Sequence, residues 1–173
     1  MVQLNFSPFP DFITERLLLR SLIPEDENEI FVLRSDERIL KYLDSPIAKT
    51  IDDASKFIRK INSGIDKNEW IYWGISLRGE RKLIGTICIW NISKENISAD
   101  IGFVLHPDYQ GKGFIQETLL KIIQYGFETM KLKCINAEVD PNNSKSIKLL
   151  EKNNFIIKSK IDNTVFYTLR NQD

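Results

Sequence analysis

A glycine-rich stretch in the second half of the chain has the residue types of an anion-binding loop. It reads Gln110-Gly111-Lys112-Gly113-Phe114-Ile115 and leads into a segment with helical periodicity. Glycines let the backbone come close to a ligand, and the first N–H groups of a helix have no partner inside the helix. Lys112 adds a mobile positive charge. We therefore expect this stretch to hold a phosphate or a pyrophosphate.

The stretch does not match the better-known phosphate loops. It lacks the Gly-Lys-Ser/Thr of a P-loop, and Gln116 stands where the third glycine of a dinucleotide fingerprint would fall. A glycine-rich helix entry that binds nothing is an equally good interpretation of the loop alone. The kind of ligand must therefore be inferred from the rest of the chain.

Scarce residue types exclude several reaction classes. The 173 residues include one histidine and two cysteines. His106 alone cannot build a multi-histidine metal site, and Cys88 and Cys134 lack the spacing of a metal or redox motif. Both cysteines lie in apolar runs, so we expect two reduced, buried thiols. We predict no metal site and no nucleophile–histidine pair.

The charge balance limits the partners. Lys and Arg together number 24, as do Asp and Glu, which argues against nucleic-acid binding. Residues 110–160 nevertheless carry nine lysines against five acidic residues, so the basic segment coincides with the glycine-rich loop. No apolar run approaches the roughly 20 residues of a membrane span, and the N-terminus does not resemble a signal peptide. We expect a cytoplasmic protein that binds neither nucleic acid nor membrane.

Hydrophobic periodicity predicts one α/β domain over residues 1–173, with an irregular segment at residues 1–13. Strands are predicted at 16–20, 70–77, 83–90, 97–105, 134–139, 155–161 and 165–169. Helices are predicted from Pro24, from Thr50 to Gly64, over 115–130 and over 144–152, with a short helical turn at 38–42. A polar connection is expected at 91–96. The three strands between residues 70 and 105 form an antiparallel meander in a mixed sheet.

Several stretches together resemble one family. They are Thr14–Arg20, Leu83–Ile87, Ala99–Phe103, the Q/R-x-x-G-x-G/A-like Tyr109–Phe114, the N-x-x-S helix in Pro141–Ser146, and Leu149–Phe155. On these residues the chain resembles the GNAT family of acetyl-CoA-dependent N-acetyltransferases, and within it the ribosomal-protein N-terminal acetyltransferase type (RimJ/RimL-like). The resemblance covers residues 13–169. Two positions depart from the pattern: Ile115 replaces a small residue, and Asn154 replaces the glycine before Phe155.

The resemblance implies the GNAT fold, a mixed and mostly antiparallel sheet of about seven strands flanked by about four helices. It places a splay between the fourth and fifth strands, here 97–105 and 134–139. Acetyl-CoA is then the co-substrate. Its pantetheine arm is expected along the backbone of Phe103, Val104 and Leu105 like an added strand, with its pyrophosphate on residues 110–115. Asn143 either contacts the pantetheine or orders the start of the following helix.

The resemblance also implies direct attack of an amine on the thioester, without an acyl-enzyme. Ser146 would protonate the leaving thiolate, although a polar residue in the first turn of a helix is the structural alternative. Asp100 would act as general base through a water molecule, or else only pair with a lysine at a strand end. The carboxylate that this group carries further on has no match, because Lys158-Ser159-Lys160 occupies the region. Tyr42 and Trp73 are expected to wall the acceptor pocket, with core packing as the alternative.

The sequence thus predicts an N-acetyltransferase that acts on a primary amine, with a protein N-terminus as the leading acceptor. A small amine such as a polyamine, amino acid or antibiotic stays open as the acceptor, as does a non-catalytic acyl-CoA-binding sensor. A homodimer is compatible with this group, but no pattern in the sequence identifies its surface.

Overall fold

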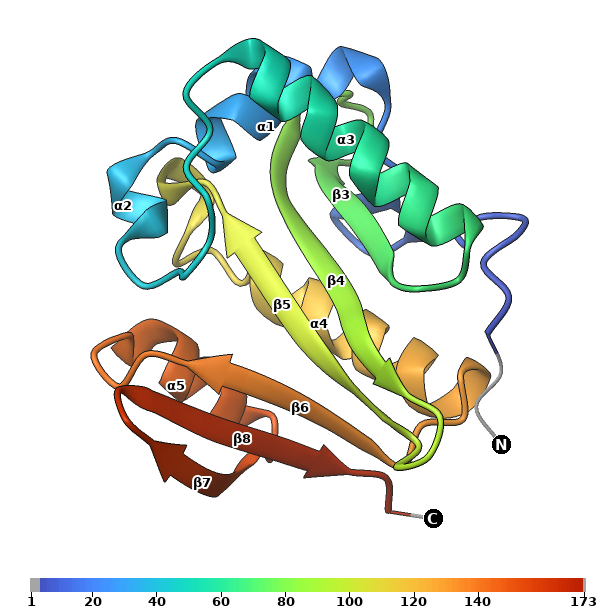
Figure 1. Ribbon diagram of the computed structural model, residues 1–173, viewed down its shortest axis with the longest axis vertical. Helices are drawn as coiled ribbons and strands as arrows, with labels where there is room; N and C mark the ends of the chain where they lie inside the picture. The colour runs from blue at the N-terminus through green and yellow to red at the C-terminus, as the bar shows by residue number, and fades with distance from the viewer. Residues whose placement is uncertain (1–3, 173) are drawn as a thin grey trace.

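The computed structural model describes residues 4–172, which form an eight-stranded sheet with helices on both faces (Figure 1). The strand order is β1-β2-β3-β4-β5-β6-β8-β7. The strands are β1 Phe12–Ile13, β2 Leu17–Arg20, β3 Ile71–Leu77, β4 Leu83–Ser93, β5 Ser98–Leu105, β6 Cys134–Val139, β7 Ile156–Ile161 and β8 Thr164–Arg170. The predicted mixed sheet is confirmed. Its extra strand, β1, lies within the segment expected to be irregular, of which residues 1–3 fall outside the described residues.

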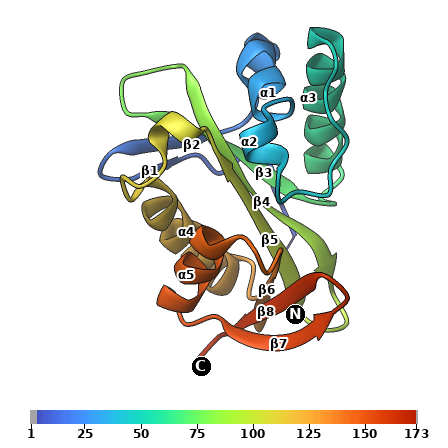
Figure 2. The ribbon, with the colours of Figure 1, turned by 90° about the vertical axis from the view of Figure 1, so that its left-hand side faces the viewer.

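Five α-helices cover the two faces of the sheet (Figure 2). They are α1 Glu27–Leu33, α2 Glu37–Leu40, α3 Ile51–Asp66, α4 Phe114–Gln124 and α5 Ser144–Lys152. Successive strand residues point to opposite faces. Tyr72 meets Phe57 of α3 with ring centroids 6.0 Å apart, whereas Trp73 meets Tyr125, just beyond α4, at 5.5 Å. We call the α3 side the front face and the α4 side the back face.

Strands β5 and β6 are the only parallel neighbours in the described sheet, and they stay paired over a short distance. The pairs run from Ser98–Cys134 to Asp100–Asn136. Beyond that point Ile101–Leu105 and Ala137–Val139 have no shared ladder, and Figure 1 shows the two strands diverging. We call the Asp100–Asn136 end of this ladder the fork. The predicted splay is therefore confirmed.

Helix α3 begins as predicted but ends later. The Thr50 side chain accepts from the Asp53 N–H at 3.2 Å, and the Asp53 carboxylate accepts from the Thr50 N–H at 3.0 Å, which is a complete capping box. The predicted end at Gly64 is wrong, because the helix continues through Asp66. The indole of Trp70 packs so closely on Gly64 that any Cβ there would overlap it. This glycine serves packing and not helix termination.

Two further boundaries differ from prediction. Strand β4 continues to Ser93, which pairs with Ser98, so the connection expected at 91–96 is partly strand. The long helix expected over 115–130 is α-helical through Gln124 and then continues as a π-helical turn, Tyr125–Thr129. Within residues 4–172, none of the helices has both the length and the apolar content that crossing a membrane requires.

Candidate functional site

The glycine-rich loop forms the N-terminal end of α4, as the sequence predicts. Gly111 and Gly113 have φ angles of +75° and +81°, a region that side-chain-bearing residues rarely adopt. Gly113 is the residue before the helix, and no side chain caps the helix there. Open space surrounds the position that a Gly111 Cβ would occupy. The first N–H groups of α4 are therefore available to an anion, and this arrangement fits a diphosphate.

Side chains from the β5 side and from the β6 side of the fork hold this loop. Gln110 donates from Nε2 to the Leu105 carbonyl at 3.0 Å, which ties the loop to the end of β5. Lys145, in the first turn of α5, donates from Nζ to Gln110 Oε1 at 3.2 Å. Lys112 donates from Nζ to the Asp108 carbonyl at 2.9 Å. Two ammonium groups therefore flank the loop, one of them reaching it from the helix that follows β6.

Helix α5 begins with the Asn143 and Ser146 singled out in the sequence. Asn143 caps the helix by accepting the Ser146 backbone N–H on Oδ1 at 3.2 Å. The Ser146 hydroxyl makes no hydrogen bond with another residue of the described chain, and the residue is half-buried. The capping interaction explains Asn143 structurally. The Ser146 hydroxyl, in contrast, remains available as a proton donor.

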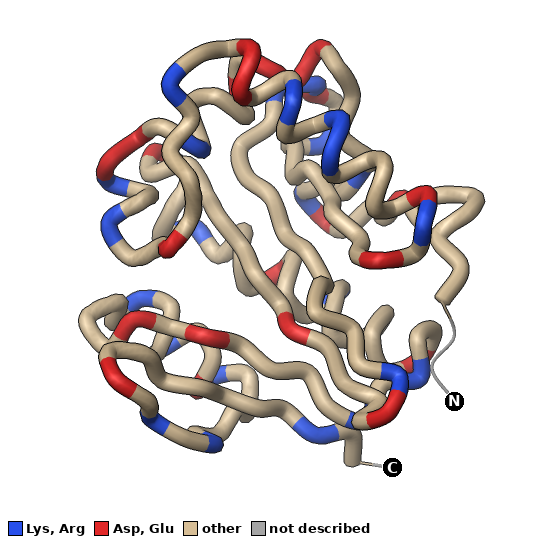
Figure 3. Tube along the Cα trace, in the orientation of Figure 1, with Lys and Arg blue, Asp and Glu red and all other residues tan. Residues whose placement is uncertain are grey.

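The central strands carry only two charged residues, and both are carboxylates at the fork. Across β3, β4, β5 and β6 these are Asp100 and Glu138; Figure 3 shows the otherwise uncharged strands. Asp100 is 7% exposed. It accepts from the side-chain amides of Asn91 at 2.7 Å and Asn136 at 3.3 Å. These two amides hold the Asp100 carboxylate at the point where the strands separate.

Glu138 is a candidate that the sequence reasoning missed. It follows Asn136 by two residues and therefore lies on the same, front face as Asp100. Although Glu138 is an exposed residue, partial desolvation and the negative charge of Asp100 both raise the pKa of its carboxyl above the ordinary value. A carboxylate with a raised pKa beside a second carboxylate is suited to accept a proton near neutral pH. The signal that could have identified it is side-chain alternation along the strand, which places Glu138 on the same face as Asn136, the partner of Asp100.

The structure does not bring Tyr42 and Trp73 together. Trp73 is 0% exposed on the back face, where it packs against Tyr125, and its Nε1 donates to the Pro10 carbonyl at 2.7 Å. With no exposed surface it has nothing to offer an acceptor, so we assign it to the core. Tyr42 is half-buried in the segment after α2, with Lys41 Nζ 5.2 Å from its ring centre.

Cys88 does not have the properties of a nucleophile. Cys88 is buried, and burial raises the pKa of its thiol to about 12, so the thiol stays protonated at neutral pH. Cys134 is a half-buried free thiol at the start of β6. Covalent catalysis through Cys88 is therefore disfavoured. Residues 4–172 contain no cluster of three or more side chains of the kinds that bind metals.

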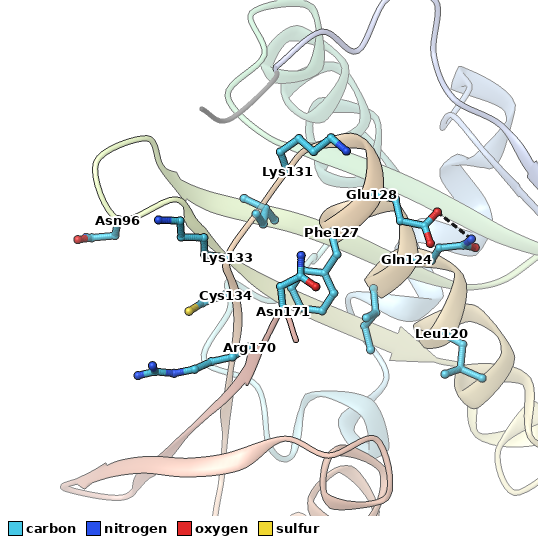
Figure 4. Close-up of a pocket in the computed structure, with 12 residues that line it drawn as sticks. Asn96, Leu120, Gln124, Phe127, Glu128, Lys131, Lys133, Cys134, Arg170 and Asn171 are labelled. Atoms are coloured by element: carbon cyan, nitrogen blue, oxygen red, sulfur yellow. Dashed lines mark hydrogen bonds between the residues drawn. The ribbon is translucent and has the colours of Figure 1, made fainter. Parts of the chain in front are cut away.

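A hollow of about 790 Å³ lies away from the loop and the fork, beside the end of α4 and the start of β6 (Figure 4). Its lining includes Leu120 and Phe127 together with Lys133 and Arg170. Figure 4 shows Lys133 and Arg170 pointing away from Phe127, so their charges do not converge on its apolar wall. We place the functional site at the loop and the fork, because the groups capable of chemistry gather there.

Comparison with known proteins identifies the family of the chain. Residues 16–156 match the family model described as an acetyltransferase (GNAT) domain. The uncharacterized N-acetyltransferase YoaA of Bacillus subtilis is 31% identical over 147 residues, which cover 85% of this chain and 83% of that protein.

Solved structures show the same fold. A GNAT-family acetyltransferase from Bacillus anthracis is 27% identical with a TM-score of 0.80, covering 93% of this chain and 98% of that one. The ribosomal-protein-S5-alanine acetyltransferase of Vibrio fischeri has a TM-score of 0.83 over 95% of this chain and 98% of its own. At 20% identity, that second likeness shows the fold alone.

The matched family uses acetyl-CoA as acyl donor, and the uncapped glycine loop at the start of α4 fits the diphosphate of that molecule. The family model extends over most of the chain, and the strands separate at the predicted place. The chain therefore belongs to the GNAT family and is an N-acetyltransferase.

Proposed function

We propose that residues 1–173 act as a single domain that transfers acetyl directly from acetyl-CoA to the N-terminal amine of a polypeptide. The observation that carries this proposal is the front face at the fork. Asp100 and Glu138 are the only charges on the central strands, and beyond them the face has no helix over it and presents Phe166, Ile156 and Ile161. A single ammonium group attached to an extended chain fits this arrangement.

The donor half of the site is the side of the fork that carries the loop. Residues 110–115 would hold the pyrophosphate, and the backbone of Phe103–Leu105, which pairs with β4 but not with β6, would hold the pantetheine arm. Bound acetyl-CoA supplies the thioester carbonyl that the amine attacks. The backbone N–H of Leu105, which faces away from β4, would polarise that carbonyl as an oxyanion donor does.

Three side chains would manage the protons. Glu138 accepts the proton of the acceptor amine through a water molecule, because its raised pKa brings its basicity closer to that of the amine. Asp100 keeps that pKa raised and is itself held by two amides. Ser146 donates its hydroxyl proton to the departing thiolate, because that hydroxyl has no competing partner in the described chain.

The front face of β8 and β7, which no helix covers (Figure 1), would bind the acceptor beyond its amine. Glu138 is paired across the ladder with Phe166, and Thr168 is paired with Ile156 on the edge strand. Ile156 and Ile161 are 62% and 57% exposed. Neither β7 nor β8 contributes a carboxylate. A polyamine would need acidic groups spaced along its path, whereas a peptide with apolar side chains does not.

The test is release of free CoA thiol from acetyl-CoA with a panel of N-terminal peptides, polyamines, amino acids and aminoglycosides. We expect turnover on peptides, with kcat/KM at least about tenfold above that of any small amine. Preference for a small amine would establish the alternative acceptor class. Binding of CoA without turnover on any acceptor would identify a sensor.

A pair of adjacent substitutions tests the acceptor surface. Ile156→Ser alters the front face, while Ile157→Ser alters the back face, since Ile157 is paired with Tyr167 on the α5 side. Both side chains are well exposed, at 62% and 47%. We expect Ile156→Ser to raise the KM for peptide by a few-fold, the effect of one exposed apolar contact. Ile157→Ser should leave that KM unchanged, and equal effects would contradict the assignment.

A further inference from the structure

We propose that Arg16 and Glu117 form a clamp that positions the glycine loop and thereby sets the affinity for acetyl-CoA. We call this pair the clamp. The inference rests on the proposed CoA site at residues 110–115. Neither residue is in that loop, and they are separated by 101 positions. Both would be positioning residues, since they act on the cofactor through the loop.

Glu117 is the centre of the clamp. Its Oε2 lies 2.7 Å from Arg16 Nε, and its Oε1 accepts from the Arg16 backbone N–H at 2.8 Å. The Thr14 hydroxyl donates to the same Oε1 at 2.6 Å. Glu117 lies in the first turn of α4. The start of α4 is therefore bound by three hydrogen bonds to the segment leading into β2.

Arg16 then reaches three consecutive residues of the loop. Its Nη1 donates to the Lys112 carbonyl at 2.8 Å, and its guanidinium lies 4.5 Å from the centre of the Phe114 ring. Its Nη2 is 3.3 Å from the position that a Cβ on Gly113 would occupy. One side chain thus fixes the path of the backbone at the residue before the helix.

Because the peptide bond is planar and trans, the contact between Arg16 and the Lys112 carbonyl also sets the direction of the Gly113 N–H. The carbonyl of Lys112 and the N–H of Gly113 belong to one peptide unit and point in opposite directions. When Arg16 holds that carbonyl, the Gly113 N–H is directed away from Arg16. The clamp therefore keeps a carbonyl dipole out of the phosphate position and orients an N–H group for it.

The clamp acts by geometry more than by net charge. Burial alone would raise the pKa of Glu117, but hydrogen bonds from Thr14 and Arg16 outweigh burial and hold the pKa below the ordinary value. Glu117 is therefore ionised at neutral pH and offsets the charge of Arg16. Because the pair is neutral overall, its effect on CoA affinity should persist at high salt, where the effect of a free lysine fades.

Isothermal titration with CoA and steady-state kinetics test the clamp in Arg16→Gln and Glu117→Gln. We expect each to raise the Kd for CoA and the KM for acetyl-CoA by about tenfold, the scale of one charge-assisted hydrogen bond. Turnover at saturating acetyl-CoA and the acceptor KM should stay unchanged. Arg16→Lys should recover part of the affinity, since an ammonium group can replace one of the contacts of the guanidinium but not all of them. The double variant should be no worse than either single one.

Two controls separate the possible failures. Arg20→Gln removes the paired contacts of Arg20, the last residue of β2, with Asp26; it should lower Tm and leave the Kd for CoA unchanged. A lower Tm with an unchanged Kd for CoA in the Arg16 and Glu117 variants would show that the pair is merely structural, and it would overturn the clamp. Unchanged CoA affinity in Gly113→Glu would instead show that the loop is not the CoA site, and the proposed function would fail with it.

Discussion

The two sides of the fork are built in different ways. On the donor side, the groups that would hold CoA come from one stretch, Phe103–Ile115, and are mainly backbone groups, those of the loop being shaped by Gly111 and Gly113. On the acceptor side, Asp100 and Glu138 come from two strands, and the apolar surface comes from a third and a fourth. The donor side is a local structure, whereas the acceptor side exists only after the sheet has assembled.

This difference explains what each side recognises. A loop of backbone donors suits an invariant ligand, because N–H groups recognise a diphosphate without side-chain variation. A surface of exposed side chains suits a ligand that differs between relatives, since single substitutions on β7 or β8 change it without disturbing the core. Variants of the two sides should therefore separate into effects on CoA affinity and effects on acceptor turnover.

The largest effect is expected on the donor side from Gly113→Glu. The substitution forces a side chain into a φ of +81° and starts it 3.3 Å from Arg16 Nη2, so it disturbs the clamp and the backbone N–H groups of the loop and adds a negative charge there. We expect loss of detectable CoA binding by calorimetry. Gly79→Glu is the matched control, because Gly79 has a φ of +80° with open space around it in the β3–β4 turn. It should bind CoA normally, and equal loss in both variants would point to strain alone.

The next effect is expected on the acceptor side from Glu138→Gln. Removing the proton acceptor should lower kcat by about a hundredfold, the usual scale for a general base, without changing the Kd for CoA. Because the pKa of Glu138 is raised, the acid limb of the wild-type pH–rate profile should lie above the pKa of an ordinary glutamate, and the variant should lose that limb. Glu128→Gln, on the helix turn beyond α4, is the control. A retained acid limb in Glu138→Gln would remove Glu138 from the mechanism.

A smaller effect is expected where the two sides meet, from Ser146→Ala. We expect kcat to fall by about tenfold, less than the roughly hundredfold or more of a typical general acid, because water can protonate the thiolate in its place. Tm should stay unchanged, because the Ser146 hydroxyl has no partner in the described chain. Asn143→Ala should give the opposite pattern. It removes the helix cap and should lower stability by about 1 kcal/mol. A fall in Tm with unchanged kcat in Ser146→Ala would assign the serine to structure.

The smallest effect is a shift in pH dependence from Asp100→Asn. The negative charge of Asp100 contributes to the raised pKa of Glu138. Removing that charge lowers the pKa of Glu138, so deprotonated base persists to lower pH and the acid limb should move toward lower pH. The measurement is kcat against pH at saturating substrates. A shift toward higher pH would contradict electrostatic coupling between the two carboxylates.

Several elements were predictable because their signals are local. Strand β6 and helix α5 have the predicted bounds, and the Thr50–Asp53 capping box starts α3 as expected. Gly64 was misread because a glycine suggests a helix end, whereas its partner Trp70 is identified only by packing. Strand β1 was missed because two residues carry too little pattern to predict a strand.

By itself the sequence determined the periodic elements, the glycine loop and the family, since each depends on residues close together in the chain. Tertiary structure decided which face each strand residue occupies. Alternation places Tyr72 and Trp73 on opposite faces of the sheet. It does not show which of these faces α4 covers, where Trp73 is buried. Tertiary structure also decided which distant groups meet, as Asp100 does with Glu138 and Arg16 with Glu117. These contacts depend on strand register and helix packing, which no local pattern encodes.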